Sequence, residues 1–345
     1  MMYSISINFP NILALCILVA LIAYALFGGA DFGGGVWDLF ASGSRKAAQR
    51  ETIAHAIGPI WEANHVWLII VVVLMFVCFP PAFATIMTVL HIPLSLMLIG
   101  IVARGSAFTF RAYDARGAAT VPTTVLGRTF AIASVLTPLL LGVSLGTIAA
   151  GRVTLPTPGV SAYAIYVEPW LAPFPIACGV LAVVLFAYLA AVYLTVAAED
   201  PAIQEDFRRR ALWSAVAVFV AAFGTLALAL TDAPSIKQGL TETPWAIVLH
   251  AATGVAAISA IVAVWRRRYR AARIAAAMQV ALIIAGWGAS QYPWMIPGSA
   301  TIAVSAAPEA TLRWTLSALA AGAVVLLPSL WYLFTLFDRE VPSRN

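Results

Sequence analysis

Nine apolar runs dominate this sequence and limit what it can fold into. Each is long enough to cross a hydrocarbon layer of about 30 Å as a helix, which takes roughly 20 residues. We expect helices because lipid offers no partners to backbone polar groups, and the alternation typical of a membrane β-barrel is missing. The nine runs cover residues 11–30, 57–79, 82–103, 126–149, 171–196, 211–231, 245–265, 274–292 and 313–336.

The composition supports an all-α integral membrane protein. Of 345 residues, 62% are hydrophobic and 10% are charged, whereas a soluble domain carries about 25% charged residues. A soluble enzyme, a nucleic-acid-binding protein and a disordered chain are therefore excluded. The connections near 104–125, 150–170 and 293–312 hold about 20 residues each, too few for an independent core. We expect residues 1–345 to form a single polytopic membrane domain.

The basic residues predict the orientation of the chain. Seventeen of the 20 Lys and Arg residues follow the odd-numbered runs, and only Arg152, Lys237 and Arg313 lie on the opposite side. Basic residues accumulate in cytoplasmic loops, so the N-terminus is expected outside and the C-terminus in the cytoplasm. This topology and the anionic headgroups of membrane lipids account for the basic clusters without a nucleic-acid partner.

Three ionisable residues lie at the expected cytoplasmic ends of apolar runs: Asp31, Glu62 and Arg104. A carboxylate at the centre of a membrane helix costs about 2.5 to 3.5 kcal/mol, so such a group usually faces protein or water and often serves ion movement. Buried ion pairs also occur without any such role. The sequence therefore leaves a structural ion pair or triad and a functional site both open.

Histidines accompany Glu62 along one face of the second run. His55, Gly58, Glu62 and His65 recur at helical spacing and form one drifting polar stripe. Carboxylates and imidazoles along such a stripe can pass protons, because their surroundings can bring both pKa values toward neutrality. His91, in the middle of the third run, is either a further member of this stripe or, as we expect, a core histidine. A haem held by His65 and His91 is a weaker alternative that rests on their similar expected depth.

Two other patterns predict packing rather than ligand binding. The glycines of residues 28–35 follow a membrane helix, match no phosphate-binding motif and contain a G-x-x-x-G step, which favours close helix packing. Cys16, Cys78 and Cys178 show no C-x-x-C spacing, so no metal site is expected in this chain.

Two motifs resemble a known family. The segment FGGADFGGGVWDL at 27–39 and the segment GPIWEANHVWLI at 58–69 resemble the signature of subunit II of the bd-type quinol oxidases, and look closest to the cyanide-insensitive branch. The segment YPWMIPGS at 292–299 is a weaker match. Many family members carry Asp and Gln where this sequence has Glu62 and His65.

The resemblance implies a fold and a complex. The fold would be two four-helix bundles plus a peripheral ninth helix, in a bacterial cytoplasmic membrane. The partner would be subunit I, which in that family holds two haems b, one haem d and the quinol site. The reaction would be quinol oxidation coupled to reduction of O2 to water. This chain would stabilise subunit I without being catalytic alone, and a structural quinone or lipid and small single-helix subunits would be further partners.

The resemblance also implies roles for particular residues. Asp31, Glu62 and Arg104 match the residues associated with a cytoplasmic proton path, with His65 and His55 as additional candidates. Trp67 would lie near an oxygen route.

Two other functions remain open. An ion-coupled secondary transporter would use Glu62 for its coupling ion, but it predicts inverted repeats and interrupted helices, and neither is evident. The third reading is a purely structural membrane subunit with an inert salt bridge.

Overall fold

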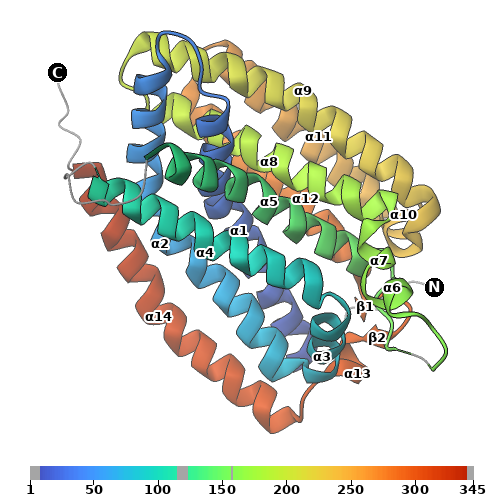
Figure 1. The fold of residues 1–345 in the computed structure, drawn as a ribbon. Coiled ribbons are helices and arrows are strands. Elements are labelled where there is room, and N and C mark those ends of the chain that lie inside the picture. The colour runs from blue at the N-terminus through green and yellow to red at the C-terminus, as the bar shows by residue number, and fades with distance from the viewer. Residues whose placement is uncertain (1–7, 115–122, 157, 340–345) are drawn as a thin grey trace.

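The computed structural model describes residues 8–114, 123–156 and 158–339; several side chains inside its helices, including those of 58–63, lie outside the description. Long helices running alongside one another make up most of the molecule (Figure 1). They are α1 (Phe9–Leu39), α2 (Lys46–Cys78), α4 (His91–Asp114), α5 (Thr123–Ala149), α8 (Pro173–Ala197), α9 (Pro201–Asp232), α11 (Pro244–Trp265), α12 (Tyr269–Gln291) and α14 (Glu309–Arg339).

Short elements connect these helices. They are α3 (Pro80–Val89), α6 (Ala162–Tyr166), α7 (Glu168–Leu171), α10 (Pro234–Thr241), α13 (Ile302–Ser305), β1 (Trp294–Ile296) and β2 (Ala300–Thr301). The two strands form an antiparallel hairpin within the connection from α12 to α14.

The predicted all-helical membrane class is confirmed. Eight of the nine predicted runs fall on one long helix each, to within two residues where they overrun it. In the described part of the chain, seven helices are long and apolar enough to span a membrane, or eight if the bent pair of Asn64–Cys78 and Pro80–Val89 counts as one span. The count of nine spans therefore stays a prediction.

The third run is the exception, because the predicted single helix over 82–103 is wrong. Its first residues form α3, which is bent by 117° against α2, and a new helix, α4, begins at His91. Proline explains the break. Pro93 has no amide hydrogen to donate to the carbonyl of Val89, and its ring would clash with that carbonyl in a continuous helix.

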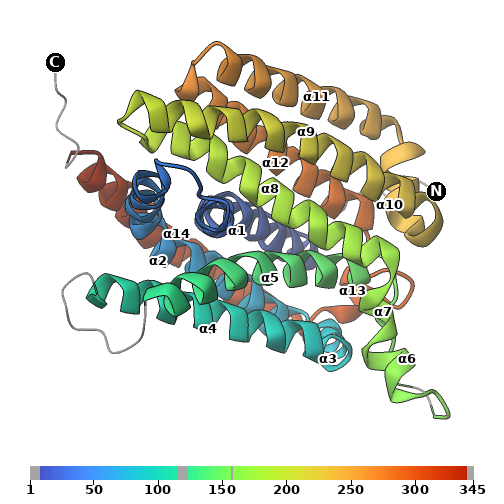
Figure 2. The same ribbon diagram turned by 45° about the horizontal axis from the view of Figure 1, so that its top comes forward.

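Helix α1 occupies the middle of the molecule, in contact with α2, α5, α8 and α12 (Figures 1 and 2). Its glycines permit this. A Cβ atom on Gly33 would clash with the carbonyl oxygen of Phe186 on α8, and one on Gly35 would clash with the hydroxyl of Ser134 on α5. The predicted role of the glycine-rich segment in close helix packing is confirmed.

The long helices make contacts in two sets of four. In the first set α1 contacts α2 and α5, and α4 packs on α5. In the second set α8, α9, α11 and α12 contact one another in sequence, and α8 joins the two sets by packing on α1 and α5. Helix α14 lies along α1 and α2 (Figure 1). This arrangement agrees with the two bundles and peripheral helix implied by the resemblance, which remain a prediction.

Three basic connections meet at one end of the molecule. Arg45, in the loop between α1 and α2, pairs with Asp206 near the start of α9. Arg208 of α9 donates to the carbonyl oxygen of Trp265 at the end of α11. The predicted topology places these connections on the same side of the membrane, and that side stays a prediction.

Candidate functional site

The centre of the site is an ion pair between Asp31 of α1 and Arg104 of α4, whose residues are 0% and 1% exposed. Arg104 donates from Nη1 to Oδ2 of Asp31 at 2.9 Å and from Nη2 to Oδ1 at 2.5 Å. Nη2 also donates to the backbone carbonyl oxygen of Asp31 at 2.9 Å. This forked geometry fixes both side chains, because a planar guanidinium matches a carboxylate along two parallel bonds.

Neighbouring side chains complete the surroundings of Arg104. Its Nε donates to the hydroxyl oxygen of Ser134 at 2.9 Å, and that hydroxyl donates to the carbonyl oxygen of Phe130 at 2.7 Å. The guanidinium carbon lies 4.8 Å from the ring centroid of Phe32 and 4.7 Å from that of Phe130. Both distances suit cation–π attraction, which is stronger in a desolvated site. Arg104 is therefore satisfied by charge, hydrogen bonds and aromatic faces together.

The pair lies further from the ends of its two helices than the sequence predicted. Asp31 and Arg104 were expected to end their helices, but α1 continues to Leu39 and α4 to Asp114. At 1.5 Å per residue, Asp31 lies about 12 Å and Arg104 about 15 Å inside those helix ends. The helices can continue because each charge is neutralised by the other within the helix bundle.

Asn64 is a site residue that the sequence analysis missed. It is fully buried on α2, and its Nδ2 donates to Oδ2 of Asp31 over a long 3.5 Å. Its Oδ1 has no hydrogen-bond partner among the described residues. A Cβ atom on Gly28 would lie 3.0 Å from this oxygen, so glycine at that position gives Asn64 its room. The sequence alone could have indicated Asn64 as a site residue, because it is a polar residue inside an apolar run.

His65 lies next to the ion pair and faces an open groove. Together with Ile101, Gly105 and Ser106 of α4, it lines an open groove of about 510 Å³ between α2 and α4. His65 follows Asn64 directly, and Gly105 follows Arg104. His65 therefore lies beside the ion pair, and the polar stripe itself stays a prediction.

The other members of the stripe are less close or lie outside the description. Glu62 belongs to α2, but its side chain lies outside the described residues. His55 is exposed, and ten residues separate it from His65, which is about 15 Å along the helix. His55 is therefore not part of the buried site.

His91 is not a core histidine, and this prediction is wrong. It begins α4 as an exposed residue, with Nδ1 2.9 Å from the carbonyl oxygen of Thr88 and its ring 5.1 Å from that of Tyr166. Arg104 is thirteen residues further along α4, about 20 Å away. Since His65 lies near Arg104, the proposed pairing of His65 with His91 around a haem is also wrong. The break at Leu90 moved His91 from the middle of a span to the start of a helix.

Trp67 lies one turn beyond Asn64, where the surroundings become apolar. Its ring stacks on Phe27 with centroids 6.3 Å apart and planes 3° from parallel. Its Nε1 is buried without a hydrogen-bond partner among the described residues. The side chain packs against the core cluster that contains Tyr24 and Leu189. One helical turn thus separates the polar surroundings of Asp31 from an apolar interior.

The sequence matches the family described as cytochrome bd terminal oxidase subunit II over residues 9–337. The chain belongs to this family. Two curated proteins of Bacillus subtilis (strain 168) are similar over shorter segments. Cytochrome bd ubiquinol oxidase subunit 2 is 36% identical over 97 residues, which is 28% of each chain. A putative cytochrome bd menaquinol oxidase subunit II is 30% identical over 87 residues, 25% of each. The matched segments span about a quarter of the length of these relatives.

A solved structure extends the similarity to the whole fold. The structure of bd oxidase from Geobacillus thermodenitrificans superposes with a TM-score of 0.80 and covers 95% of this chain and 98% of that one. At 22% identity, this likeness shows the fold alone. Cytochrome bd oxidases are complexes of the bacterial inner membrane, and the multiple membrane-spanning helices of this subunit II agree with that location.

Proposed function

We propose that this chain is the haem-free subunit II of a bd-type oxidase that oxidises quinol and reduces O2 to water. The observation that carries the proposal is the family match over residues 9–337. The chain would stabilise a haem-bearing subunit I and would not be catalytic alone. Small single-helix subunits and a structural quinone or lipid are further expected partners.

The histidines support placing the haems in the partner. All four histidines lie in the described part of the chain. His55 and His91 are exposed, His65 lines the groove beside Arg104, and Nε2 of His250 lies 2.9 Å from the carbonyl oxygen of Leu240. His65 and His91, the one pair considered for a haem, lie far apart, which supports the proposal of a haem-free chain. The two haems b and the haem d expected for the complex belong in subunit I.

The proposed contribution of this chain is a cytoplasmic proton path. The pair of Asp31 and Arg104 buries two charges. Their desolvation costs free energy, and hydrophobic residues in the same places would avoid that cost. Such a pair is a fixed electrostatic feature that can orient Asn64 and water. His65 and Glu62 would be the groups that take up and release protons, since imidazole titrates near neutral pH and carboxylates can be brought there.

The proposed oxygen route is the apolar region around Trp67 and Phe27. Dioxygen is a small apolar molecule, so stacked aromatic rings beside a well-packed core suit it better than the polar surroundings of Asp31. The separation of the two regions by one turn of α2 would let protons and oxygen take different paths.

The test uses the purified complex with quinol as the electron donor. Glu62→Gln and His65→Gln are expected to slow oxygen consumption and proton uptake about tenfold or more, as general acid–base losses do, with the haem spectrum unchanged. His91→Gln, at the far end of α4, is the matched control and should leave both rates intact. Unchanged rates across pH in the first two variants would leave the purely structural role.

Purification itself tests the broader assignment. A red or green complex with a second large subunit is expected. A colourless protein that purifies alone and takes up a solute would instead support the transporter.

A further inference from the structure

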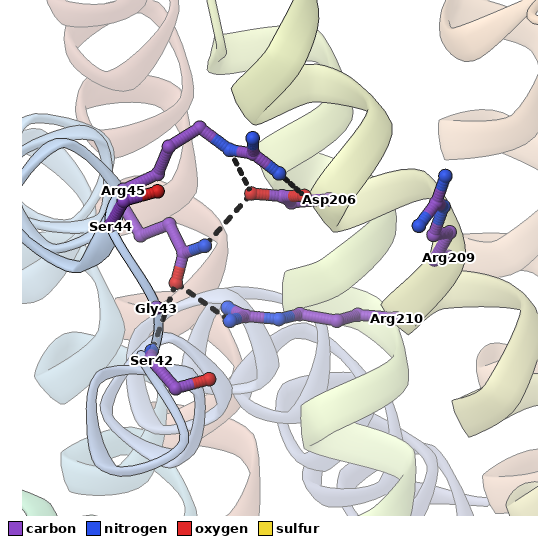
Figure 3. Close-up of a pocket in the computed structure, with 8 residues that line it drawn as sticks. Ser42, Gly43, Ser44, Arg45, Asp206, Arg209 and Arg210 are labelled. Carbon is purple, nitrogen blue, oxygen red and sulfur yellow. Dashed lines mark hydrogen bonds and ion pairs between the residues drawn. The ribbon is translucent and has the colours of Figure 1, made fainter.

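A pocket of about 300 Å³ lies at the end of the molecule where the basic connections meet. It is formed by the loop between α1 and α2 and by the first turns of α9, as Figure 3 shows. The lining residues that matter here are Ser44, Arg45, Gln49, Asp206, Arg209 and Arg210. Neither the proton path nor the oxygen route uses this pocket.

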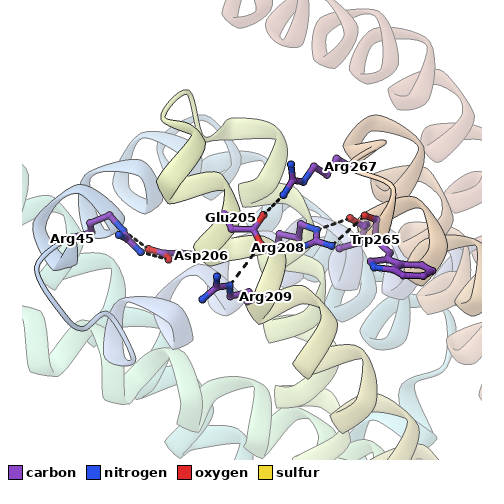
Figure 4. Close-up of polar contacts among 8 residues, drawn as sticks. Arg45, Glu205, Asp206, Arg208, Arg209, Trp265 and Arg267 are labelled. Atoms are coloured by element: carbon purple, nitrogen blue, oxygen red, sulfur yellow. Dashed lines mark hydrogen bonds and ion pairs between the residues drawn. The ribbon is translucent and has the colours of Figure 1, made fainter.

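Positive charge exceeds negative charge around the pocket. Three arginines and one carboxylate line it. The carboxylate, that of Asp206, already accepts from Arg45 at 2.9 and 2.6 Å and from Gln49 at 2.8 Å, whereas the guanidinium of Arg209 points away from it (Figure 3). Arg209 is 3.7 Å from Glu205. Glu205 is shared, because it also pairs with Arg208 at 2.8 Å and Arg267 at 3.2 Å (Figure 4). In the described part of the chain, four of these five arginines pair with the two carboxylates, and Arg210 pairs with neither.

Arg210 is the least compensated of the five. No described carboxylate lies within 4.0 Å of it, and its Nη2 donates to neutral oxygens, Oε1 of Gln49 at 2.7 Å and the carbonyl of Phe40 at 3.4 Å. Its guanidinium lies 5.3 Å from the ring of Trp37 and 5.2 Å from that of Phe207. Its Nη1 is buried without a hydrogen-bond partner among the described residues. These contacts hold the guanidinium at the pocket without cancelling its charge.

The start of α2 adds to the positive potential. Arg45 is the N-cap of this 33-residue helix, no side chain caps its first amide groups, and no acidic residue occupies its first turn. The amide of Lys46 donates to the carbonyl oxygen of Gly43, and the following amide groups together with the helix dipole favour an anion at such an end. The pocket therefore combines an uncapped helix start with an excess of guanidinium groups.

We infer that this pocket binds a phosphate group, that of an anionic phospholipid headgroup. Arginines recognise phosphate oxygens through forked hydrogen bonds. Exposed aromatic residues favour a lipid as the source. Phe40, which precedes the pocket loop, is 60% exposed, and Trp213, one turn beyond Arg209 and Arg210 on α9, is 75% exposed. Aromatic side chains beside cationic ones are typical of the membrane interface, where acyl chains begin. This inference does not depend on the oxidase activity.

A charge placed in the pocket tests the inference without removing a contact. Ser44 is exposed, and no described side-chain hydrogen bond involves its hydroxyl. Ser44→Glu adds a carboxylate beside Arg45, whereas Ser44→Gln adds a neutral side chain of the same size and is the matched control. The delipidated complex is titrated with phosphatidylglycerol or phosphatidylcholine in detergent, and bound lipid is counted by native mass spectrometry. Phosphatidylglycerol is expected to bind selectively, and Ser44→Glu should weaken that binding about tenfold or more.

A second pair of variants tests the role of Arg210. Arg210→Gln is expected to weaken phosphatidylglycerol binding by a similar factor, whereas Arg266→Gln, an exposed arginine outside the pocket, should not. The haem spectrum reports whether each variant complex assembles. If Arg210→Gln does not assemble, Ser44→Glu alone tests phosphate binding in the pocket.

A competition experiment with inorganic phosphate distinguishes a lipid headgroup from free phosphate as the source of the bound phosphate group. If it displaces phosphatidylglycerol with the same dependence on Ser44→Glu, the phosphate site is supported and free phosphate is a second ligand. Equal binding of the two lipids, or equal behaviour of Ser44→Glu and Ser44→Gln, would overturn the inference.

Discussion

Both terminal nitrogens of Arg104 donate to Asp31, one to each carboxylate oxygen. The pair thereby joins α4 to α1 across 73 residues of sequence. The bond from Nη2 to the carbonyl oxygen of Asp31 adds a contact with the backbone of α1 itself. The pair therefore fixes the position of one helix relative to the other as well as the direction of the carboxylate.

Removing one partner should be far more harmful than removing both. Arg104→Gln leaves the carboxylate of Asp31 buried without a cation, at an expected cost of about 3 to 5 kcal/mol. The double variant Asp31→Asn with Arg104→Gln buries no charge and should recover most of this loss. Thermal unfolding of the purified complex, followed by its haem absorbance, measures both. The explanation fails if the double variant is no more stable than Arg104→Gln.

The close approach of α1 and α8 can be tested with a single methyl group. Gly33→Ala places a Cβ atom against the carbonyl oxygen of Phe186, a backbone atom that cannot rotate away. Such overpacking typically costs about 1 to 3 kcal/mol, so a lower unfolding temperature is expected. Gly254→Ala on α11 is the control, because nothing lies within 4 Å of its new Cβ atom. There the substitution should be neutral or stabilise by about 0.5 to 1 kcal/mol through the better helix propensity of alanine. Equal effects at both positions would contradict this account.

The helices and the main site residues were predictable because lipid imposes simple rules. Backbone polar groups must pair within helices, and charges must be neutralised, so apolar runs and rare ionisable residues carry most of the information. The positive-inside distribution predicts that Asp31 and Arg104 lie near the same side of the membrane. Their pairing in the structure agrees with that placement.

The remaining details depend on contacts between residues far apart in sequence. Helix ends could not be read from hydropathy, because α1 continues through nine residues beyond the apolar run while Asp31 is neutralised from α4. The roles of Ser134 and Phe130 follow only from the packing of α5 against α4. The break at Leu90 had a local signal in Pro93, but proline alone does not distinguish a kink from a new helix.

Arg208 should anchor the end of α11 to α9. Its Nε and Nη2 donate to the carbonyl oxygens of Val264 and Trp265, both at 3.2 Å. The carbonyl of Val264 also accepts from the backbone amide of Arg267, so the bond to Trp265, in the last turn of the helix, matters most. Arg208→Gln is expected to cost about 1.5 to 3 kcal/mol, the range for hydrogen bonds that involve a charged group. Hydrogen exchange of the last turn of α11 should rise in this variant. Arg266→Gln, a neighbouring exposed arginine, should leave that exchange unchanged, and an equal rise in both would exclude the anchoring role.

Two substitutions of Trp67 distinguish a role in the proposed oxygen route from a role in packing. Trp67→Phe keeps an apolar ring against Phe27 and removes a buried N–H that has no partner among the described residues, so the complex should stay folded with its oxygen dependence little changed. Trp67→Gln introduces a polar side chain that brings water into the apolar region. On the proposed route, the KM for oxygen should then rise several-fold, while kcat at saturating oxygen and the haem spectrum are retained. Oxygen consumption traces on the purified complex measure this directly. If the two variants share the oxygen dependence of the unaltered complex, oxygen does not pass Trp67.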